Sequence, residues 1–249
     1  MAKKSKTENE EPGTEVINWE DELGKQAKAI AKTETPSVNK IKFTSGIMSY
    51  MDNAMPDNTL DCIIVAAIAE HVWYPEKWKA NDIKPPGCFA LGEAGEPLFP
   101  HAKVPNPIHE NCDGCPKFKW NSDPEGGRGK ACSERRRLAV IPAPQSLDDI
   151  KDSELAMMSI PVTSVKQWAN YVNKLSAATQ RPPWGVLTRV TLVPDAKNQF
   201  KVSFTAQEPL NHEQLPLVHS RIDVALSSLM IPYEMNPEQH QEEEGDKKY

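Results

Sequence analysis

The stretch from residue 84 to residue 135 constrains this chain most, because it holds too little apolar side chain to build a hydrophobic core of its own. It is rich in proline and glycine, poor in aliphatic residues, and contains four of the chain's five cysteines. A bound metal ion can organise such a segment, since the free energy of ligation then becomes free energy of folding. We therefore expect a metal-dependent subdomain here.

The spacing of these cysteines is typical of a zinc site. It reads C-x23-C-x2-C-x16-C, and Asp113 and Gly114 are suitable turn residues for directing two sulfurs at one point. Zn²⁺ takes four ligands in a tetrahedron, and a closed set of four indicates a structural ion. His109 is an alternative fourth ligand, and a set of unrelated free thiols is the other interpretation. The expected ligands are Cys88, Cys112, Cys115 and Cys132.

Cationic and aromatic residues surround the cysteines. Such a mixture suits single-stranded nucleic acid, because cations track the phosphates while flat rings stack on unpaired bases. The segment Gly126–Lys130 is no Walker A loop, since Ala131 follows the lysine where Ser or Thr is needed. The alternative for each ring is core packing, and for the three arginines a solvated turn. The candidate contacts are Trp73, Tyr74, Lys117, Phe118, Lys119, Trp120, Arg128, Lys130, Arg135, Arg136 and Arg137.

Charge is distributed unevenly along the chain. The formal net charge of −6 excludes a uniformly basic binder of nucleic acid, but residues 115–137 carry seven Lys or Arg against three acidic residues. Residues 1–22 carry three Lys against seven acidic residues, and residues 234–249 carry two against six. A basic centre between acidic ends suggests contact with a polyanion or inhibition by a tail, with ordinary solvated termini as the alternative.

Periodicity predicts an α+β chain led by strands, and the 22 prolines argue against a helical bundle. Expected strands are 41–43, 59–72, 138–141 and a hairpin of 186–193 with 200–205. For 59–72 the β-branched residues favour a buried strand, and a helix is the alternative that periodicity leaves open. Expected helices are 19–30, one behind an S-x-x-Q capping box at Ser164, and one from Asn211 to Leu229. We expect a small β-barrel with a zinc-ribbon insertion at about 84–135 and a few peripheral helices. The expected organisation is a disordered segment at 1–15, one core domain at 16–232 and an acidic tail at 233–249.

Several motifs resemble a group of bacteriophage proteins taken to be single-stranded DNA-binding proteins. They are Pro86-Gly87-Cys88, Cys112-Asp113-Gly114-Cys115-Pro116, the segments 127–132 and 136–140, Ser159–Ser164 and the 186–204 hairpin. More distantly, the plan is similar to the T4-type phage single-stranded DNA-binding proteins. That resemblance implies an OB-fold, an inserted zinc subdomain, a basic start and an acidic tail that recruits replication or recombination proteins.

The sequence therefore predicts a non-enzymatic protein that binds single-stranded DNA in phage replication or recombination. The alternative is a zinc-ribbon module that binds a protein of a transcription or replication complex. A metal-dependent nuclease is disfavoured, because no carboxylate-rich open site is visible. No secretory signal and no run near 18 apolar residues occur, so we expect a cytoplasmic protein with no membrane partner. The resemblance to phage proteins implies that this is the cytoplasm of the bacterial host.

Overall fold

The computed structural model describes residues 19, 22–26, 39–76, 84–124 and 126–234. The chain divides into two units, Met1–Ser37 and Val38–Tyr249. In the first unit, residues 19 and 22–26 are helical, as the spacing of Trp19 and Leu23 predicts. The predicted disordered segment 1–15 and residues 235–249 of the predicted acidic tail lie outside the described residues.

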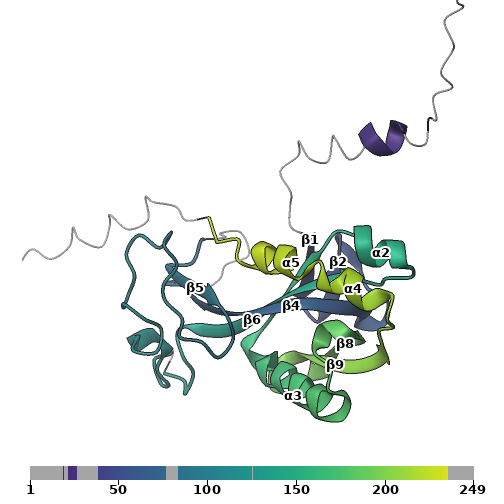
Figure 1. Ribbon diagram of the computed structural model, residues 1–249. Coiled ribbons are helices and arrows are strands. Elements are labelled where there is room, and N and C mark those ends of the chain that lie inside the picture. The colour runs from purple at the N-terminus through teal and green to yellow at the C-terminus, as the bar shows by residue number, and fades with distance from the viewer. Residues whose placement is uncertain (1–18, 20–21, 27–38, 77–83, 125, 235–249) are drawn as a thin grey trace, which may run out of the picture. The chain divides into compact units, whose positions relative to one another are not determined.

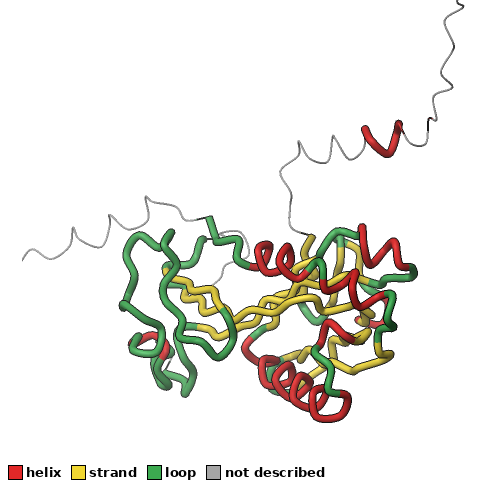
Figure 2. Tube along the Cα trace, in the orientation of Figure 1, coloured by secondary structure: helices red, strands yellow, loops and turns green. Residues whose placement is uncertain are grey.

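A nine-stranded sheet forms the frame of the second unit (Figures 1 and 2). Its order is β3-β2-β1-β7-β6-β4-β8-β9, and β5 pairs with β4 beside this path. The β1–β7 pair is parallel and the other pairs are antiparallel. The strands are β1 (Asn39–Thr44), β2 (Ile47–Tyr50), β3 (Asn53–Ala54), β4 (Thr59–Trp73), β5 (Cys88–Gly92), β6 (Ser133–Pro142), β7 (Ala156–Ile160), β8 (Val186–Asp195) and β9 (Gln199–Pro209).

The apolar run expected as a strand at 59–72 is β4, the central strand of the sheet. On one edge β6 follows it from Cys62 to Val72. On the other edge β8 covers only Thr59–Cys62, and β5 covers Ala69–Trp73. The far end of β4 therefore extends beyond β8, and it carries the cysteine-rich stretch between β5 and β6 (Figure 1).

Helices cover both faces of the sheet. One core cluster packs Ile64 and Leu138 of the sheet against Trp168 of α3, and the other packs Ile68 against Ile150 of α2 and Leu229 of α5. The helices are α2 (Leu147–Asp152), α3 (Val162–Thr179), α4 (Gln214–His219) and α5 (Ile222–Leu229), with 3-10 turns η1 (Pro56–Asn58), η2 (Pro116–Phe118) and η3 (Pro183–Gly185). No helix of the described residues is long and apolar enough to cross a membrane.

The sheet curls, so strands that are far apart in its order approach each other. Phe43 of β1 and Phe200 of β9 both pack on the cluster covered by α3, and both line one surface hollow. A curled, sheet-dominated α+β fold with few helices is compatible with the predicted β-led class. The OB-like barrel and the zinc ribbon stay predictions.

Local predictions were right where side-chain periodicity is strong. The strands predicted at 41–43 and 138–141 and the hairpin are confirmed as β1, β6 and β8–β9. The capping box at Ser164 is wrong, because α3 begins earlier, after Pro161, and buried Ser164 instead accepts a bond from the N–H of Val202. The last helix is two short helices broken near Ser220, although Asn211 and Gln214 do exchange the predicted capping bonds.

Candidate metal centre and cationic surface

Strand pairing places Cys88 and Cys132 on one face at the end of β4. Cys88 stands opposite Trp73, and Ser133 stands opposite Val72, so Cys132 continues β6 to the level of Trp73. Directly opposed residues of antiparallel strands project to the same face. Cys88 and Cys132 therefore flank Trp73 on that face.

Backbone hydrogen bonds fold the C-x2-C turn onto this face. The N–H of Cys112 donates to the carbonyl of Leu98 (2.9 Å), and that of Cys115 donates to the carbonyl of Cys112 (3.2 Å). The N–H of Cys132 donates to the carbonyl of Lys117, two residues beyond Cys115 (2.8 Å). The turn is thereby joined to the beginning of β6, beside Cys132.

The four cysteines line one cavity with a volume of about 20 Å³, which is room for a water-sized body. Burial, and then the charge of the neighbouring thiols, raises the pKa of Cys112 and of Cys132 to about 12. Burial likewise raises the pKa of Cys88. Independently of these pKa values, four sulfur donors around one cavity are the residue types that bind a soft cation.

This donor set fits Zn²⁺, which is commonly held by four thiolates. All five cysteines are free thiols, and Cys62 is buried within β4 in the core, as expected. Within the described ranges, however, no three or more His, Cys, Asp or Glu side chains are arranged as a metal-binding group. The residue types suit zinc while the side-chain positions do not form a coordination shell, so zinc stays a prediction.

Two histidines line the same cavity. The Nδ1 atom of His109 lies 3.1 Å from the carbonyl oxygen of Asn111, and a Cβ on Gly114 would lie 2.5 Å from His109 Cε1. The glycine of the C-x2-C turn therefore lets His109 lie against it. Sequence reasoning missed His71, although its place two residues before Trp73 on β4 puts it on the same face. The ring of His71 stacks on Phe118 at 4.1 Å between centroids, and its buried Nδ1 has no hydrogen-bond partner among the described residues.

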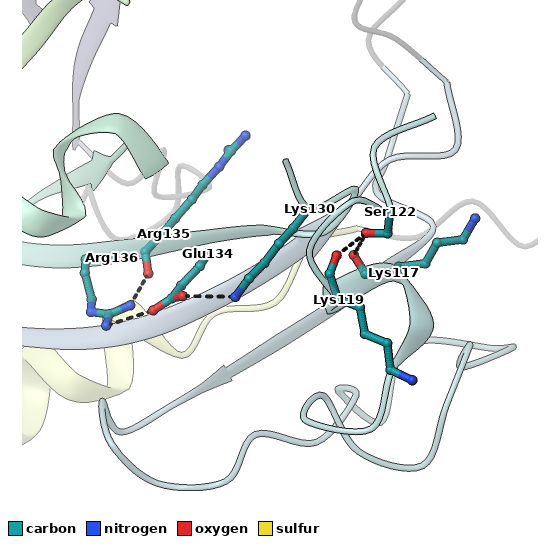
Figure 3. Close-up of polar contacts among 7 residues, drawn as sticks. All are labelled: Lys117, Lys119, Ser122, Lys130, Glu134, Arg135 and Arg136. Carbon is teal, nitrogen blue, oxygen red and sulfur yellow. Dashed lines mark hydrogen bonds and ion pairs between the residues drawn. The ribbon is translucent and has the colours of Figure 1, made fainter. Parts of the chain in front are cut away.

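Ser122 fixes the loop that carries the predicted nucleic-acid contacts. Its Oγ lies 2.9 Å from the carbonyl oxygen of Lys117 and 2.6 Å from that of Lys119 (Figure 3). The same Oγ accepts the N–H of Ala131 at 2.9 Å. One hydroxyl thus joins both ends of the loop. Nothing in the local sequence singles out this serine, because its partners are backbone groups on both sides of the loop.

The loop's cations and rings divide into engaged and open groups. The Nζ of Lys130 lies 3.6 Å from the centroid of Phe118 and 5.3 Å from that of Trp120, and the Nζ of Lys117 lies 5.1 Å from that of Trp73. Phe118 is therefore enclosed between His71 and a lysine, and a base cannot stack on it there. Trp120 is 71% exposed and keeps open ring surface.

The arginine run splits between two faces because β6 is a strand. Arg136 stands opposite Ala69, on the cysteine face, and its guanidinium lies 3.2 Å from Glu134. Arg135 stands opposite Glu70 and projects to the other face, as Figure 3 shows. Exposed Lys119 and Arg128 complete the cations that are open to solvent on the loop. The interpretation of the arginines as a solvated turn is wrong, since all three lie within β6.

Arg137 is a structural residue, which corrects its prediction as a phosphate contact. It is 4% exposed, and it pairs at 2.6 Å with Glu70, which is 0% exposed. Its Nη1 also donates to the carbonyl oxygens of Leu229 (3.0 Å) and Ile231 (2.8 Å). The hydroxyl of Tyr233 donates to the same Glu70 oxygen at 2.6 Å. This network ties the segment after α5 to β4 and β6, and it leaves no part of Arg137 for a ligand.

A second cationic surface lies where the curled sheet brings β1 and β9 together. It is a hollow of about 330 Å³ with Lys40, Lys42 and Arg135 as its cations and Phe43 and Phe200 as its rings. None of its lining residues is acidic, although Lys42 reaches an exposed carboxylate, that of Asp52, at 2.7 Å. Except for Arg135, sequence reasoning missed these residues, because they converge only through the curl.

Comparisons with protein-family models, with curated proteins and with solved structures found no match. The resemblance to phage single-stranded DNA-binding proteins therefore remains a prediction that rests on the quoted motifs.

Proposed function

We propose that this protein binds single-stranded DNA without sequence preference, and that it serves phage DNA replication or recombination as a binding protein and not as an enzyme. The observation that carries the proposal is the loop between Lys117 and Lys130. It presents an exposed ring, Trp120, beside exposed cations, and Ser122 holds it in place. A ring for a base and cations for phosphates are the two elements of single-strand binding.

Two surfaces contribute in this proposal. On the loop, Lys119 and Arg128 pair with phosphates while Trp120 stacks on a base, at roughly 1–3 kcal/mol per base. In the hollow, Lys40, Lys42 and Arg135 would hold further phosphates. Arg135 is five residues from Lys130 and belongs to the hollow, so β6 links the two surfaces.

The proposed role of zinc is structural. Cys88, Cys112, Cys115 and Cys132 would hold it as thiolates, and when bound it supplies the cross-link that the core-poor stretch lacks. The residues of the chain position the loop around that cross-link. The acidic residues that follow Glu234 would compete with DNA for the cations and recruit other replication proteins, as the resemblance implies.

The test is titration of labelled oligo(dT) and of a matched duplex across a salt series. Four cations without a described ion pair, together with Lys42, which would exchange Asp52 for a phosphate, predict that log Kobs falls with log [salt] with a slope of roughly −3 to −4. The four are Lys40, Lys119, Arg128 and Arg135. Trp120→Ala should weaken binding roughly 5- to 100-fold, the equivalent of one lost stacking contact. Salt-independent binding, or equal affinity for duplex, contradicts the proposal.

Charge reversal separates electrostatic contacts from general effects. Lys119→Glu with Arg128→Glu should weaken oligo(dT) binding, whereas Lys151→Glu on α2, also exposed, is the matched control and should leave it unchanged. The alternative function, a zinc-ribbon module that binds a protein, is favoured by exposed Phe99 and Trp120, at 61% and 71%. In that case the charge reversals would leave partner binding intact, and oligo(dT) binding would be weak in every variant.

A further inference from the structure

Strand β9 has an open edge. It is the last strand of the sheet, so one of its edges has no neighbouring strand in the part of the chain that the structure describes. On that edge the N–H of Val202 donates to Ser164 Oγ in α3 at 2.9 Å. Alternate residues of an antiparallel strand point their backbone groups to the same edge, so those of Phe204 and Ala206 also face away from β8. Within the described part of the chain, no backbone group bonds to them there.

Helix α3 lies beside β9 (Figure 1), and residues of both elements line a groove along this edge. Past the bond between Ser164 and Val202, helix and strand enclose a hollow of about 460 Å³. The wall residues recur three or four apart, so they share one face of the helix with Ser164. They are Gln167, Tyr171, Lys174 and Ala178.

Gln167 lines the hollow, but its Oε1 is covered by protein and has no hydrogen-bond partner among the described residues, so the strand edge supplies the accessible backbone partners. The edge at Phe204 and Ala206 offers carbonyl oxygens and N–H groups in alternation. A peptide backbone supplies both complements, whereas a nucleic-acid backbone supplies phosphate acceptors that oppose carbonyl oxygens. The occupant that matches the groove is therefore an extended polypeptide.

The charge of the groove indicates which kind of polypeptide fits it. Among the described residues that line it, Lys174 is the charged one. The whole of α3 carries Lys166 and Lys174 and no acidic residue. An occupant with a carboxylate beside Lys174 gains an ion pair, and one with a cation there is repelled.

We propose that the groove between α3 and the open edge of β9 binds an extended acidic peptide segment of a partner protein, which joins the sheet as a strand beside β9. Strand addition gives affinity through backbone bonds, and the side-chain surface beside the edge gives specificity. Phe204 and Ala206 would supply the backbone bonds, and Lys174 would select the acidic residue. The proposal is independent of DNA binding, because none of these residues belongs to the proposed DNA surfaces.

The test is fluorescence anisotropy of the full chain with two fluorescein-labelled seven-residue peptides, one alternating valine with glutamate and the other valine with lysine. The acidic peptide should bind saturably and the basic one should not. Ala206→Pro removes an open-edge N–H without touching a bond to β8, so it should weaken acidic-peptide binding at least about tenfold. Lys174→Glu should do the same, while Lys166→Glu is the matched control on the same helix.

Further measurements keep the proposal falsifiable. The N–H of Thr205 faces β8, so Thr205→Pro should lower the melting temperature, whereas Ala206→Pro should not. An equal fall in melting temperature in both variants would refute the assigned edge. The proposal would be overturned if acidic-peptide binding did not saturate below about 1 mM, because the Kd would then be too weak for specific recognition. The proposal would also be overturned if oligo(dT) displaced the acidic peptide from the wild type but no longer bound to the groove of Lys174→Glu. That result would assign the groove to nucleic acid. If the protein without peptide is a dimer and Ala206→Pro is a monomer, the open edge binds a second copy of the chain instead.

Discussion

Replacing Arg137 by methionine tests whether this residue belongs to the core or to the DNA surface. Its guanidinium neutralises Glu70, which is 0% exposed and whose second carboxylate oxygen already lacks a partner. Breaking a buried ion pair from one side costs about 3–5 kcal/mol, because the remaining charge stays buried without compensation. Whole domains have only about 5–15 kcal/mol of stability, so Arg137→Met should lower the urea midpoint severely.

Arg135, two residues before Arg137 on β6, is the matched control. Arg135→Met should change the free energy of unfolding by less than about 0.5 kcal/mol, since the residue is only half-buried and has no side-chain ion pair in the described structure. It should nevertheless weaken oligo(dT) binding, whereas folded Arg137→Met should bind oligo(dT) within about twofold of the wild type.

A double variant keeps this prediction testable if Arg137→Met fails to fold. Glu70→Leu combined with Arg137→Met removes both buried charges and should recover much of the lost stability. The reasoning is refuted if Arg137→Met unfolds at the wild-type urea concentration and weakens DNA binding as much as Arg135→Met does.

Two further predictions concern the site's support and the sheet. A Cβ at position 87 would lie 2.7 Å from the ring of Trp73, so Gly87→Ala should cost about 1–3 kcal/mol in urea unfolding; Gly185→Ala, with its nearest neighbour at 3.5 Å, should cost less, and equal costs would contradict the argument. A hydrogen bond from Arg189 lowers the pKa of Asp61. Asp61→Asn should therefore be less stable than the wild type at neutral pH, and this difference in the free energy of unfolding should vanish as the pH falls below the lowered pKa. A difference that persists in strong acid would count against this.

Sequence reasoning was sufficient where one physical pattern decides local structure. The β-branched residues of the β4 run favour a strand over the helix that periodicity leaves open, and the alternation of the β8–β9 hairpin predicts both of its strands. The cysteine spacing also anticipates that Cys88, Cys112, Cys115 and Cys132 line one cavity, because few other elements could hold the core-poor stretch.

It failed where a residue's role depends on its partner across the sheet. Arg135, Arg136 and Arg137 form one basic run in the sequence, but a strand turns neighbours to opposite faces, and Glu70, 67 residues earlier, draws Arg137 into the core. Lys40 and Phe200 form a shared hollow only because the sheet curls, and no local pattern encodes that curl.

The central claim is that a metal-linked cysteine cluster presents a loop that binds single-stranded DNA. The most direct measurement is the oligo(dT) affinity of one purified sample before and after removal of its metal by a chelator, with zinc content determined on the same material. We predict one zinc per chain, tight salt-sensitive binding when it is present, and a large loss of affinity that added zinc restores. A sample that contains no zinc and yet binds oligo(dT) with undiminished affinity would contradict the claim.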